Sequence, residues 1–435
     1  MVIYSSFKLT GKTGFAVLML IVILFCFSSL FGQKIENRDA IYDGNIVTVL
    51  CYANNDQLSD PVMKLNEPDR ITVEFDDLSN KHYPFKYTIV HCTSDWQTSN
   101  LEQMDYIDGY FEDDLTEYDF SFNAKLPYIH YYITIPNDNM RPKISGNYLL
   151  VVYLDEPVEG NILFTKRFYV LEPFTTIKTE IPYYPKNLSF TRKKQQIDLS
   201  IITPDNFALD PSRRFSITIR QNGRWDNAIE NLKPTSVNQF VLNFDFPDGI
   251  VFDGGNEPRY FDMKSFWYQS QYIRRLTPTS DGYDVVLYTD YSRRRKEYET
   301  YGNIHGRKLI KARNDQNSAL EGEYANVKFT LKQNKIENAD VYIIGAITDW
   351  QFDDNSKMMY NAALRQYEAT LFLKQGYYEY YYVVLKNGEK KGDITFVEGD
   401  HWETHNQYTV AVYYRNRMPE YDRLVGWKQF TAHEK

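Results

Sequence analysis

Apolar and polar side chains alternate with a period of two residues in several parts of the chain. Ile71, Val73 and Phe75 form one such series, with polar residues between them. The same spacing recurs in two further series, Phe215, Ile217 and Ile219, and Val327, Phe329 and Leu331. Because successive side chains of a β-strand point to opposite faces of a sheet, this pattern predicts strands that bury one face.

Two segments, residues 148–154 and 377–384, are apolar or aromatic at nearly every position. Such runs are typical of strands that are covered on both faces. No long stretch shows the period of 3.6 residues that marks an amphipathic helix, and clusters of Asn, Asp, Gly and Pro separate the runs, as at residues 136–138 and 253–256. The pattern therefore predicts an all-β protein built of tandem immunoglobulin-like β-sandwich domains.

Composition agrees with a sheet protein. Aromatic residues make up 16% of the chain, with 37 Tyr against 9 Met, and Tyr and Phe pack well on a pleated surface. The formal net charge of −9 argues against nucleic-acid binding, which needs concentrated positive charge. The strongly basic run at residues 293–296 is predicted to be a solvated loop or strand end.

The beginning of the chain is predicted to be an export signal. Residues 1–13 form a short segment that carries lysines, and residues 15–31 are uncharged and mostly apolar. This order is typical of a cleavable signal peptide, here over residues 1–32. An uncleaved membrane anchor, the alternative, usually needs about 20 apolar residues. Lipidation at Cys26 is disfavoured because the bulky Phe25 precedes it.

Length suggests two or three domains after the signal. We predict their boundaries from turn-rich and Pro-containing segments. The predicted parts are an N-terminal β-sandwich over residues 33–171, a middle β-domain over residues 172–318, a C-terminal early-set immunoglobulin-like sandwich over residues 319–415 and a tail over residues 416–435. Residues 172–187 are expected to form a linker or crossover, and the tail is expected to pack back through Tyr421, Leu424 and Trp427.

Cys51 and Cys92 remain after removal of the signal, and both lie in strand-like segments of the N-terminal unit. In an oxidising compartment they could form a disulfide, but the sequence does not fix the separation of their Cβ atoms. His91 beside Cys92 could suggest a nucleophile and its base. Since adjacent strand residues point to opposite faces, these two are not expected to exchange a proton.

His401, Glu403 and His405 alternate, and on a strand they would lie on one side at a spacing able to hold zinc. The zinc-protease pattern relies on helical spacing, so a solvent face at a strand end explains the trio more simply, and we predict no metal. Neighbouring carboxylates are interpreted as turn residues, at Asp76–Asp77, Asp113–Asp114 and Asp353–Asp354. Neither a serine nucleophile elbow nor a phosphate-binding glycine loop occurs, and we predict no enzymatic activity and no cofactor.

Residues 341–345, 348–350 and 376–380 follow the order seen in early-set immunoglobulin-like domains, and this part of the chain resembles those related to glycogen-binding modules. Such modules stack sugar rings on tryptophan, and Trp350 matches one of these positions. Their second tryptophan has no counterpart after the turn at residues 386–389. An exported glycan-binding protein that uses Trp350 is therefore the alternative function, beside a packing role for this ring.

Short motifs follow one another in order along most of the chain: Tyr42-Asp43-Gly44-Asn45, His91-Cys92 with Asp95-Trp96, Ser145-Gly146-Asn147-Tyr148, Arg224-Trp225-Asp226-Asn227, Gly254-Gly255-Asn256-Glu257 and Leu373-Lys374-Gln375-Gly376. Together they resemble the plug protein family of the type IX secretion system. Each motif alone is weak, and the resemblance depends on their order.

That resemblance implies a non-enzymatic periplasmic subunit that plugs the periplasmic opening of the outer-membrane translocon barrel between transport events. A pore wide enough for folded cargo would breach the outer-membrane permeability barrier if it stood open. The subunit would associate with the inner face of the outer membrane through protein contact, with no small-molecule substrate. Cargo of the same machinery is a weaker hypothesis, because we recognise no sorting domain near the C-terminus.

Overall fold

The computed structural model describes residues 36–158, 160–204, 210–313 and 317–433. The predicted signal peptide over residues 1–32 lies outside the described residues. Regular structure in the described ranges is almost entirely β-strand, which confirms the predicted all-β class. The helices there are single turns, α2 (Gln103–Tyr106), α3 (Pro211–Arg214), α4 (Thr395–Glu398), η1 (Leu188–Phe190) and η3 (Ala346–Thr348). None of these helices is long and apolar enough to cross a membrane.

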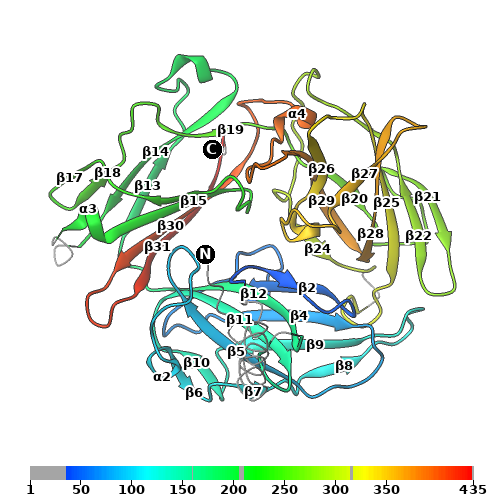
Figure 1. Ribbon diagram of the computed structural model, residues 1–435, viewed down its shortest axis with the longest axis horizontal. Coiled ribbons are helices and arrows are strands. Elements are labelled where there is room, and N and C mark those ends of the chain that lie inside the picture. Colours follow the sequence, from blue (N-terminus) through cyan, green and yellow to red (C-terminus); the bar gives the residue numbers. More distant parts are fainter. Residues whose placement is uncertain (1–35, 159, 205–209, 314–316, 434–435) are drawn as a thin grey trace, which may run out of the picture.

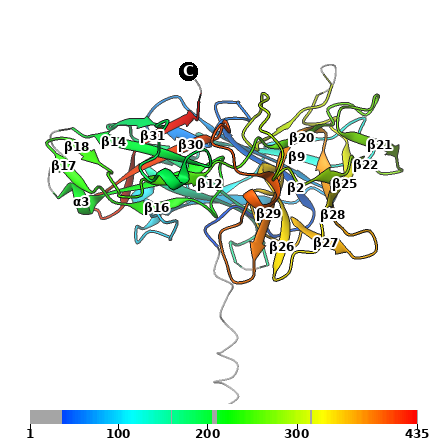
Figure 2. The ribbon, with the colours of Figure 1, turned by 90° about the horizontal axis from the view of Figure 1, so that it is seen from above.

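Three β-sandwiches are arranged around a common centre (Figure 1). We call them the N-terminal sandwich (residues 36–171, blue to cyan), the middle sandwich (residues 172–255 and 406–433, green and red) and the inserted sandwich (residues 256–405, yellow to orange). Seen from above, the three form a flattened body (Figure 2).

The N-terminal sandwich packs two sheets face to face. One sheet has the order β2 (Ile46–Ala53), β4 (Ile71–Asp77), β9 (Ile129–Ile135) and β8 (Tyr118–Phe120). The other has the order β12 (Ile162–Leu171), β11 (Gly146–Leu154), β5 (Phe85–Cys92) and β7 (Asp113–Asp114), with β1 (Ala40–Ile41) and β3 (Val62–Lys64) also paired to β12. A small ladder joins β10 (Met140–Pro142) to β6 (Ile107–Gly109).

Burial in this sandwich follows the predicted alternation. Ile71, Val73 and Phe75 of β4 all lie in the core between the two sheets. Strand β11 is covered on both faces, as predicted: Leu150 lies in the same core, and its neighbour Leu149 belongs to a second apolar cluster on the opposite face of the sheet. Period-two patterning is therefore sufficient to place these side chains.

The middle sandwich is built from two separate parts of the chain. One sheet has the order β13 (Thr176–Glu180), β14 (Lys194–Ile202), β18 (Val241–Asn243) and β17 (Ser236–Asn238), with β19 (Ile250–Asp253) also paired to β14. The facing sheet has the order β16 (Ile229–Leu232), β15 (Phe215–Gln221), β30 (Gln407–Arg415) and β31 (Asp422–Thr431). The predicted series Phe215, Ile217 and Ile219 lies in the core between these sheets.

Two segments that we expected to be connections contain strands. Residues 172–187, the expected linker, include β13, which pairs with β14 and buries Ile177 in the middle core. Residues 416–435, the expected tail, include β31, which packs back as expected and buries Leu424. Both strands are stabilised by pairing with residues distant in sequence, and a short local pattern does not show such pairing.

The inserted sandwich is formed by one long sheet that folds around its own core. Its order is β20 (Arg259–Asp262), β29 (Gly376–Lys386), β26 (Ala339–Ile344), β27 (Lys357–Asn361), β28 (Gln366–Lys374), β25 (Tyr324–Lys332), β22 (Tyr283–Leu287) and β21 (Ile273–Pro278), with β23 (Asp290–Tyr291) on β25 and β24 (Lys308–Ile310) on β29. Val327, Phe329 and Leu331 lie in this core. In β29, which we predicted to be covered on both faces, Tyr382 lies in the core and Val383 in a cluster on the other face.

The strand pairing differs from the boundary that we predicted at residues 318/319. Strands β20 and β24 precede that position but pair with β29, and β22 pairs with β25. Strand β30, which we assigned to the C-terminal unit, pairs with β15 of the middle sandwich. The inserted sandwich therefore interrupts the middle sandwich, and the chain crosses between them twice, at residues 253–258 and 399–406.

The three sandwiches share a sheet and a core where they meet. Leu171 of β12 is the pairing partner of Leu424 of β31, so one sheet continues from the N-terminal into the middle sandwich. Strand β2 serves two cores, because Val49 lies in the N-terminal core, whereas Leu50 and Tyr52 lie in the core of the inserted sandwich. These shared elements hold the three units as one body.

Candidate functional site

A buried ion pair joins the N-terminal and inserted sandwiches. Asp76 of β4 and Lys374 of β28 are each 1% exposed, and Lys374 Nζ lies 2.6 Å from Asp76 Oδ2. The same oxygen accepts a hydrogen bond from Tyr324 OH (2.5 Å), and His130 Nδ1 lies 2.7 Å from the other oxygen. Burial raises the pKa of Asp76, but Lys374 and His130 outweigh it and hold this pKa below its usual value.

The interpretation of Asp76 and Asp77 as turn residues is wrong, because both close strand β4 and are buried. Asp113–Asp114 also form a strand, β7. Asp353 does lie at a turn, where its side chain accepts a hydrogen bond from the backbone N–H of Ser356 (2.8 Å). The motif that contains Lys374 was visible in the sequence, but its buried partner was not.

A second buried ion pair lies within the middle sandwich and bonds the backbone of the inserted sandwich. Arg224 Nη2 donates to Asp226 Oδ2 (2.6 Å) and to the backbone oxygen of Gly392 (3.0 Å). Asp226 accepts in return from the backbone N–H of Gly392 (3.0 Å). Burial lowers the pKa of Arg224, but Asp226 outweighs it, so that this pKa lies above its usual value. The guanidinium is therefore charged and fixes the contact between the two sandwiches.

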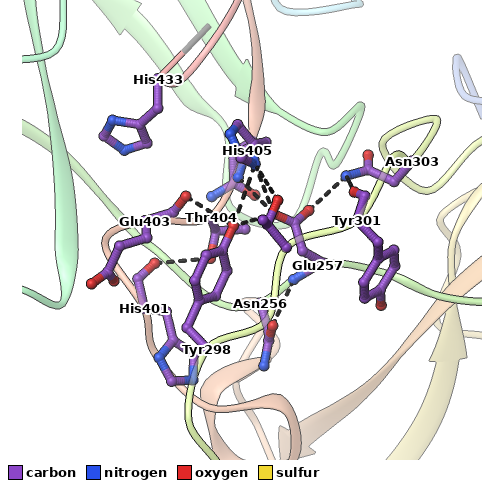
Figure 3. A network of polar contacts seen from close by, with 12 residues as sticks. Asn256, Glu257, Tyr298, Tyr301, Asn303, His401, Glu403, Thr404, His405 and His433 are labelled. Atoms are coloured by element: carbon purple, nitrogen blue, oxygen red, sulfur yellow. Dashed lines mark hydrogen bonds and ion pairs between the residues drawn. The ribbon is translucent and has the colours of Figure 1, made fainter.

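The two chain crossings between these sandwiches meet at Glu257 (Figure 3). Its buried carboxylate accepts hydrogen bonds from Tyr298 OH (2.5 Å), Asn303 Nδ2 (2.6 Å) and the backbone N–H of His405 (3.0 Å). His405 Nδ1 lies 3.1 Å from the same carboxylate. Since Glu257 belongs to the outgoing crossing and His405 to the returning one, the network ties the two crossings together.

His401, Glu403 and His405 do not converge. They lie in the returning crossing and not on a strand, contrary to the sequence interpretation. Their side chains point in different directions (Figure 3), with Glu403 exposed and His405 directed to Glu257. Among the described residues, no group of His, Cys, Asp and Glu is arranged to hold a metal ion.

The basic run is only in part a solvated loop. Residues 294–296 are exposed, as predicted. Arg293, by contrast, turns inward, and its Nε lies 2.8 Å from Oε2 of Glu398, which is fully buried. Arg259 Nη2 lies 3.0 Å from the same oxygen. The first arginine of the run therefore stabilises the inserted sandwich.

Cys51 and Cys92 are free cysteines, so the disulfide that we considered is not formed in the structure. They lie on different sheets: Cys51 Sγ faces the backbone oxygen of Arg167 (3.8 Å), and Cys92 Sγ that of Val90 (3.7 Å). Burial raises the pKa of Cys92 to about 12 and that of Cys51 further. Because the thiolate is the reactive form, neither side chain is activated as a nucleophile. His91, beside Cys92, packs on Tyr148 on the other face of the strand, as expected.

Trp350 lies between sandwiches and not on an open surface. A Cβ added at Gly223 of the middle sandwich would lie 3.2 Å from the indole, and one added at Gly306 of the inserted sandwich would lie 2.5 Å from it. The ring also packs against Tyr381, with the ring centres 6.4 Å apart. Glycines at both positions leave room for the ring. This placement favours a packing role for Trp350 over sugar stacking.

The inserted sandwich carries a group of neighbouring tyrosines that we call the aromatic patch. Two of them are exposed and three are half-buried: Tyr272 and Tyr288, and Tyr260, Tyr301 and Tyr377. The ring of Tyr260 lies 4.9 Å from that of Tyr272 and 5.6 Å from those of Tyr301 and Tyr377. The backbone N–H of Tyr288 donates to the oxygen of Tyr272, and these two side chains are 55% and 44% exposed. Exposed aromatic groups are enriched in protein interfaces, so this patch is a candidate contact surface.

Comparison with known proteins finds a match to a protein family and a similar solved structure. Residues 46–172 match the family described as the type 9 secretion system plug protein 1st domain. The chain is also similar to the crystal structure of a hypothetical protein from Parabacteroides merdae, with a TM-score of 0.87 and 28% sequence identity, covering 92% of this chain and 100% of that chain. No curated protein matches the sequence.

The two matches cover different extents of the fold. The family match begins at β2 and ends just after β12, so it coincides with the N-terminal sandwich. The structural match extends over nearly the whole chain, so the arrangement of three sandwiches is shared with the Parabacteroides merdae protein. The N-terminal sandwich thus matches the first domain of type 9 secretion system plug proteins, and this likeness covers that part of the chain alone.

Proposed function

We propose that the chain is a periplasmic accessory subunit of the type IX secretion system that closes the periplasmic opening of the outer-membrane translocon barrel between transport events. The observation that carries this proposal is the match of residues 46–172 to the plug first domain. A pore for folded cargo needs such a closure if the outer membrane is to remain a permeability barrier.

The way in which the sandwiches are joined supports the proposal. A protein that closes a wide pore must keep its shape, and the contacts between the sandwiches include a shared sheet, a strand with side chains in two cores and a buried ion pair. Buried ion pairs resist separation, because a charge left without its partner in a dry contact is costly. The three sandwiches are therefore expected to move as a unit.

The proposal places the protein at the inner face of the outer membrane, held there by contact with the barrel. We assign this contact to the aromatic patch, since it presents neighbouring rings that are already ordered by contact with one another. Aromatic residues that lose little conformational entropy on binding are frequent at the centres of protein interfaces. The remaining surface of this acidic chain favours solubility.

Affinity capture from cross-linked cells tests this function. We expect the tagged wild-type chain to recover the translocon barrel from detergent-solubilised outer membranes. The double variant Tyr272→Ala and Tyr288→Ala should recover several-fold less barrel, because both exposed rings of the patch are removed. A matched control is the double variant Tyr183→Ala and Tyr184→Ala, whose rings are 67% and 68% exposed on the middle sandwich.

The outcomes separate the function from the assigned surface. If the wild-type chain recovers no barrel even when export is blocked, the proposed function is wrong. If the patch variant and the control variant recover the barrel equally well, the function stands and the contact lies on another surface. Purified variants should be compared with the wild type by circular dichroism, so that loss of folding is not mistaken for loss of contact.

A further inference from the structure

A polar cavity lies where the three sandwiches meet. Its volume is about 160 Å³. The N-terminal sandwich contributes Lys166 and Arg167 of β12, the middle sandwich contributes Arg220 of β15, and the inserted sandwich contributes Arg307 and Lys308. A cavity that polar groups line in a protein interior ordinarily holds water or a ligand.

Cations outnumber carboxylates around this cavity. Besides the five basic side chains, the charged residues that line it are Asp39, Asp60 and Asp349. Cys51 also faces the cavity but is neutral, because burial raises the pKa of its thiol far above neutrality. The lining therefore carries an excess of positive charge inside the protein, which is costly unless a further anion balances it.

The carboxylates of Asp60 and Asp349 already have partners among the side chains around the cavity. Asp60 Oδ1 accepts from Arg307 Nη2 (2.7 Å), and Asp60 Oδ2 accepts from Gln429 Nε2 (2.6 Å). Asp349 Oδ1 lies 2.9 Å from Lys166 Nζ and 3.8 Å from Lys308 Nζ. Arg307 and Lys166 thus each have a close carboxylate partner, whereas the nearest carboxylate oxygen to Lys308 Nζ is 3.8 Å away.

Asp39 is engaged differently, because it bonds the backbone of Arg167 and not its guanidinium. Its Oδ1 accepts from the backbone N–H of Arg167 (2.7 Å). The guanidinium of Arg167 donates instead to the backbone oxygen of Asn37 (2.6 Å from Nη2) and is stacked between the rings of Trp96 and Trp225. Within the described residues no carboxylate lies within ion-pair distance of this guanidinium.

Arg220 has no close carboxylate partner in the described part of the chain. Its side chain is 11% exposed, and its nearest carboxylate oxygen, Asp60 Oδ2, is 3.8 Å from Nη2. In the described part of the chain the guanidinium donates no hydrogen bond, although it has five N–H donors. Its remaining contacts are with aromatic rings, of which Trp225 is the nearest at 4.6 Å. An acceptor with several oxygens placed in the cavity would satisfy these donors.

We propose that this cavity binds a small inorganic oxyanion of the phosphate or sulfate class. Arg220 and Lys308, from the middle and inserted sandwiches, are the groups that would hold it, with Arg167 adding positive potential from the N-terminal sandwich. A cavity of about 160 Å³ has room for such an ion together with some water. The bound ion would join all three sandwiches and stabilise the assembled body, whether or not the chain contacts the translocon.

Binding of inorganic phosphate and of sulfate to the purified chain tests the proposal. Calorimetric titration should show saturable binding at a single class of site, with chloride substituted at equal ionic strength as the reference. Tryptophan emission should change in parallel, because Trp225 contacts both Arg167 and Arg220. The separate phosphate and sulfate titrations decide which ion is preferred. The absence of saturable binding of either ion would overturn the proposal.

Variants connect the binding to the cavity. Arg220→Gln and, separately, Lys308→Met should each weaken binding by at least about tenfold, which corresponds to the loss of one charge-assisted hydrogen bond. The matched control Arg295→Gln removes an exposed cation outside the cavity and should bind as the wild type does. If Arg220→Gln does not fold, Lys308→Met still decides the matter, because Asp349 keeps Lys166 as its partner. Unchanged binding by a folded variant would contradict the proposed site.

Discussion

Replacement of Asp76 by alanine is expected to lower the free energy of unfolding by about 3–5 kcal/mol, because it leaves a buried ammonium group without its partner. Lys374 is 1% exposed and its Nζ has Asp76 Oδ2 at 2.6 Å. The backbone oxygen of Ala319, at 2.7 Å, would remain, but it carries no full charge. Tyr324 OH and His130 would lose the same acceptor.

Urea denaturation at neutral pH, followed by tryptophan fluorescence, measures this loss. The control Asp119→Ala removes an exposed carboxylate from β8 of the same sheet and should change stability by less than about 0.5 kcal/mol. The double variant Asp76→Leu with Lys374→Met removes both charges and should recover much of the loss. A loss below about 1 kcal/mol in Asp76→Ala would show that this pair does not hold the two sandwiches together.

The contribution of Glu379 to stability is expected to fall as the pH rises from about 4.5 to about 7. Burial raises the pKa of this carboxyl from 4.5 to about 7. In that window the folded chain keeps a proton that the unfolded chain has released. The stabilisation is therefore complete below pH 4.5 and is lost as the pH approaches 7, with a total of about 3 kcal/mol from this group.

The variant Glu379→Gln isolates this effect. An amide does not titrate, so the difference in unfolding free energy between wild type and variant should change by about 3 kcal/mol between pH 4.5 and 7, in favour of the variant at the higher pH. Glu379 accepts from the backbone N–H groups of Ile304 and Gly306, so the variant should also lose about 1 kcal/mol at every pH. The exposed Glu389→Gln is the control. A difference that is independent of pH would show that Glu379 is ionised throughout.

The local features of the fold could be predicted from the sequence. Alternation at Ile71, Val73 and Phe75 fixes which side chains enter the core, because the period of a strand is set by its backbone. Strands covered on both faces, such as β11 and β29, were predicted for the same reason, from runs in which both alternate sets of side chains are apolar.

The long-range features could not be predicted in this way. The insertion of one sandwich into another depends on the pairing of β15 with β30, which are separated by an entire sandwich in the sequence. The role of Asp76 depends on Lys374, which is 298 residues away. The sequence left sugar stacking by Trp350 open beside a packing role, because the packing partners Gly223 and Gly306 are distant in sequence and come from two different sandwiches.

These contacts explain why three sandwiches joined by few residues can act as one rigid part. Each pair of sandwiches has its own contact. A continuous sheet joins the N-terminal and middle sandwiches, and a shared core and an ion pair join the N-terminal and inserted sandwiches. The Arg224–Asp226 and Glu257 contacts join the middle and inserted sandwiches. A closed ring of three contacts resists opening at any one of them. This is the property that a barrel closure requires.

The permeability of the outer membrane tests the central claim most directly. In the native host, deletion of this chain should admit a large hydrophilic dye that intact cells exclude, and the wild-type chain supplied in trans should restore exclusion. Deletion of the translocon barrel together with this chain should also restore exclusion, since no pore would remain. Unchanged exclusion in cells that keep the barrel and lack this chain would contradict the account.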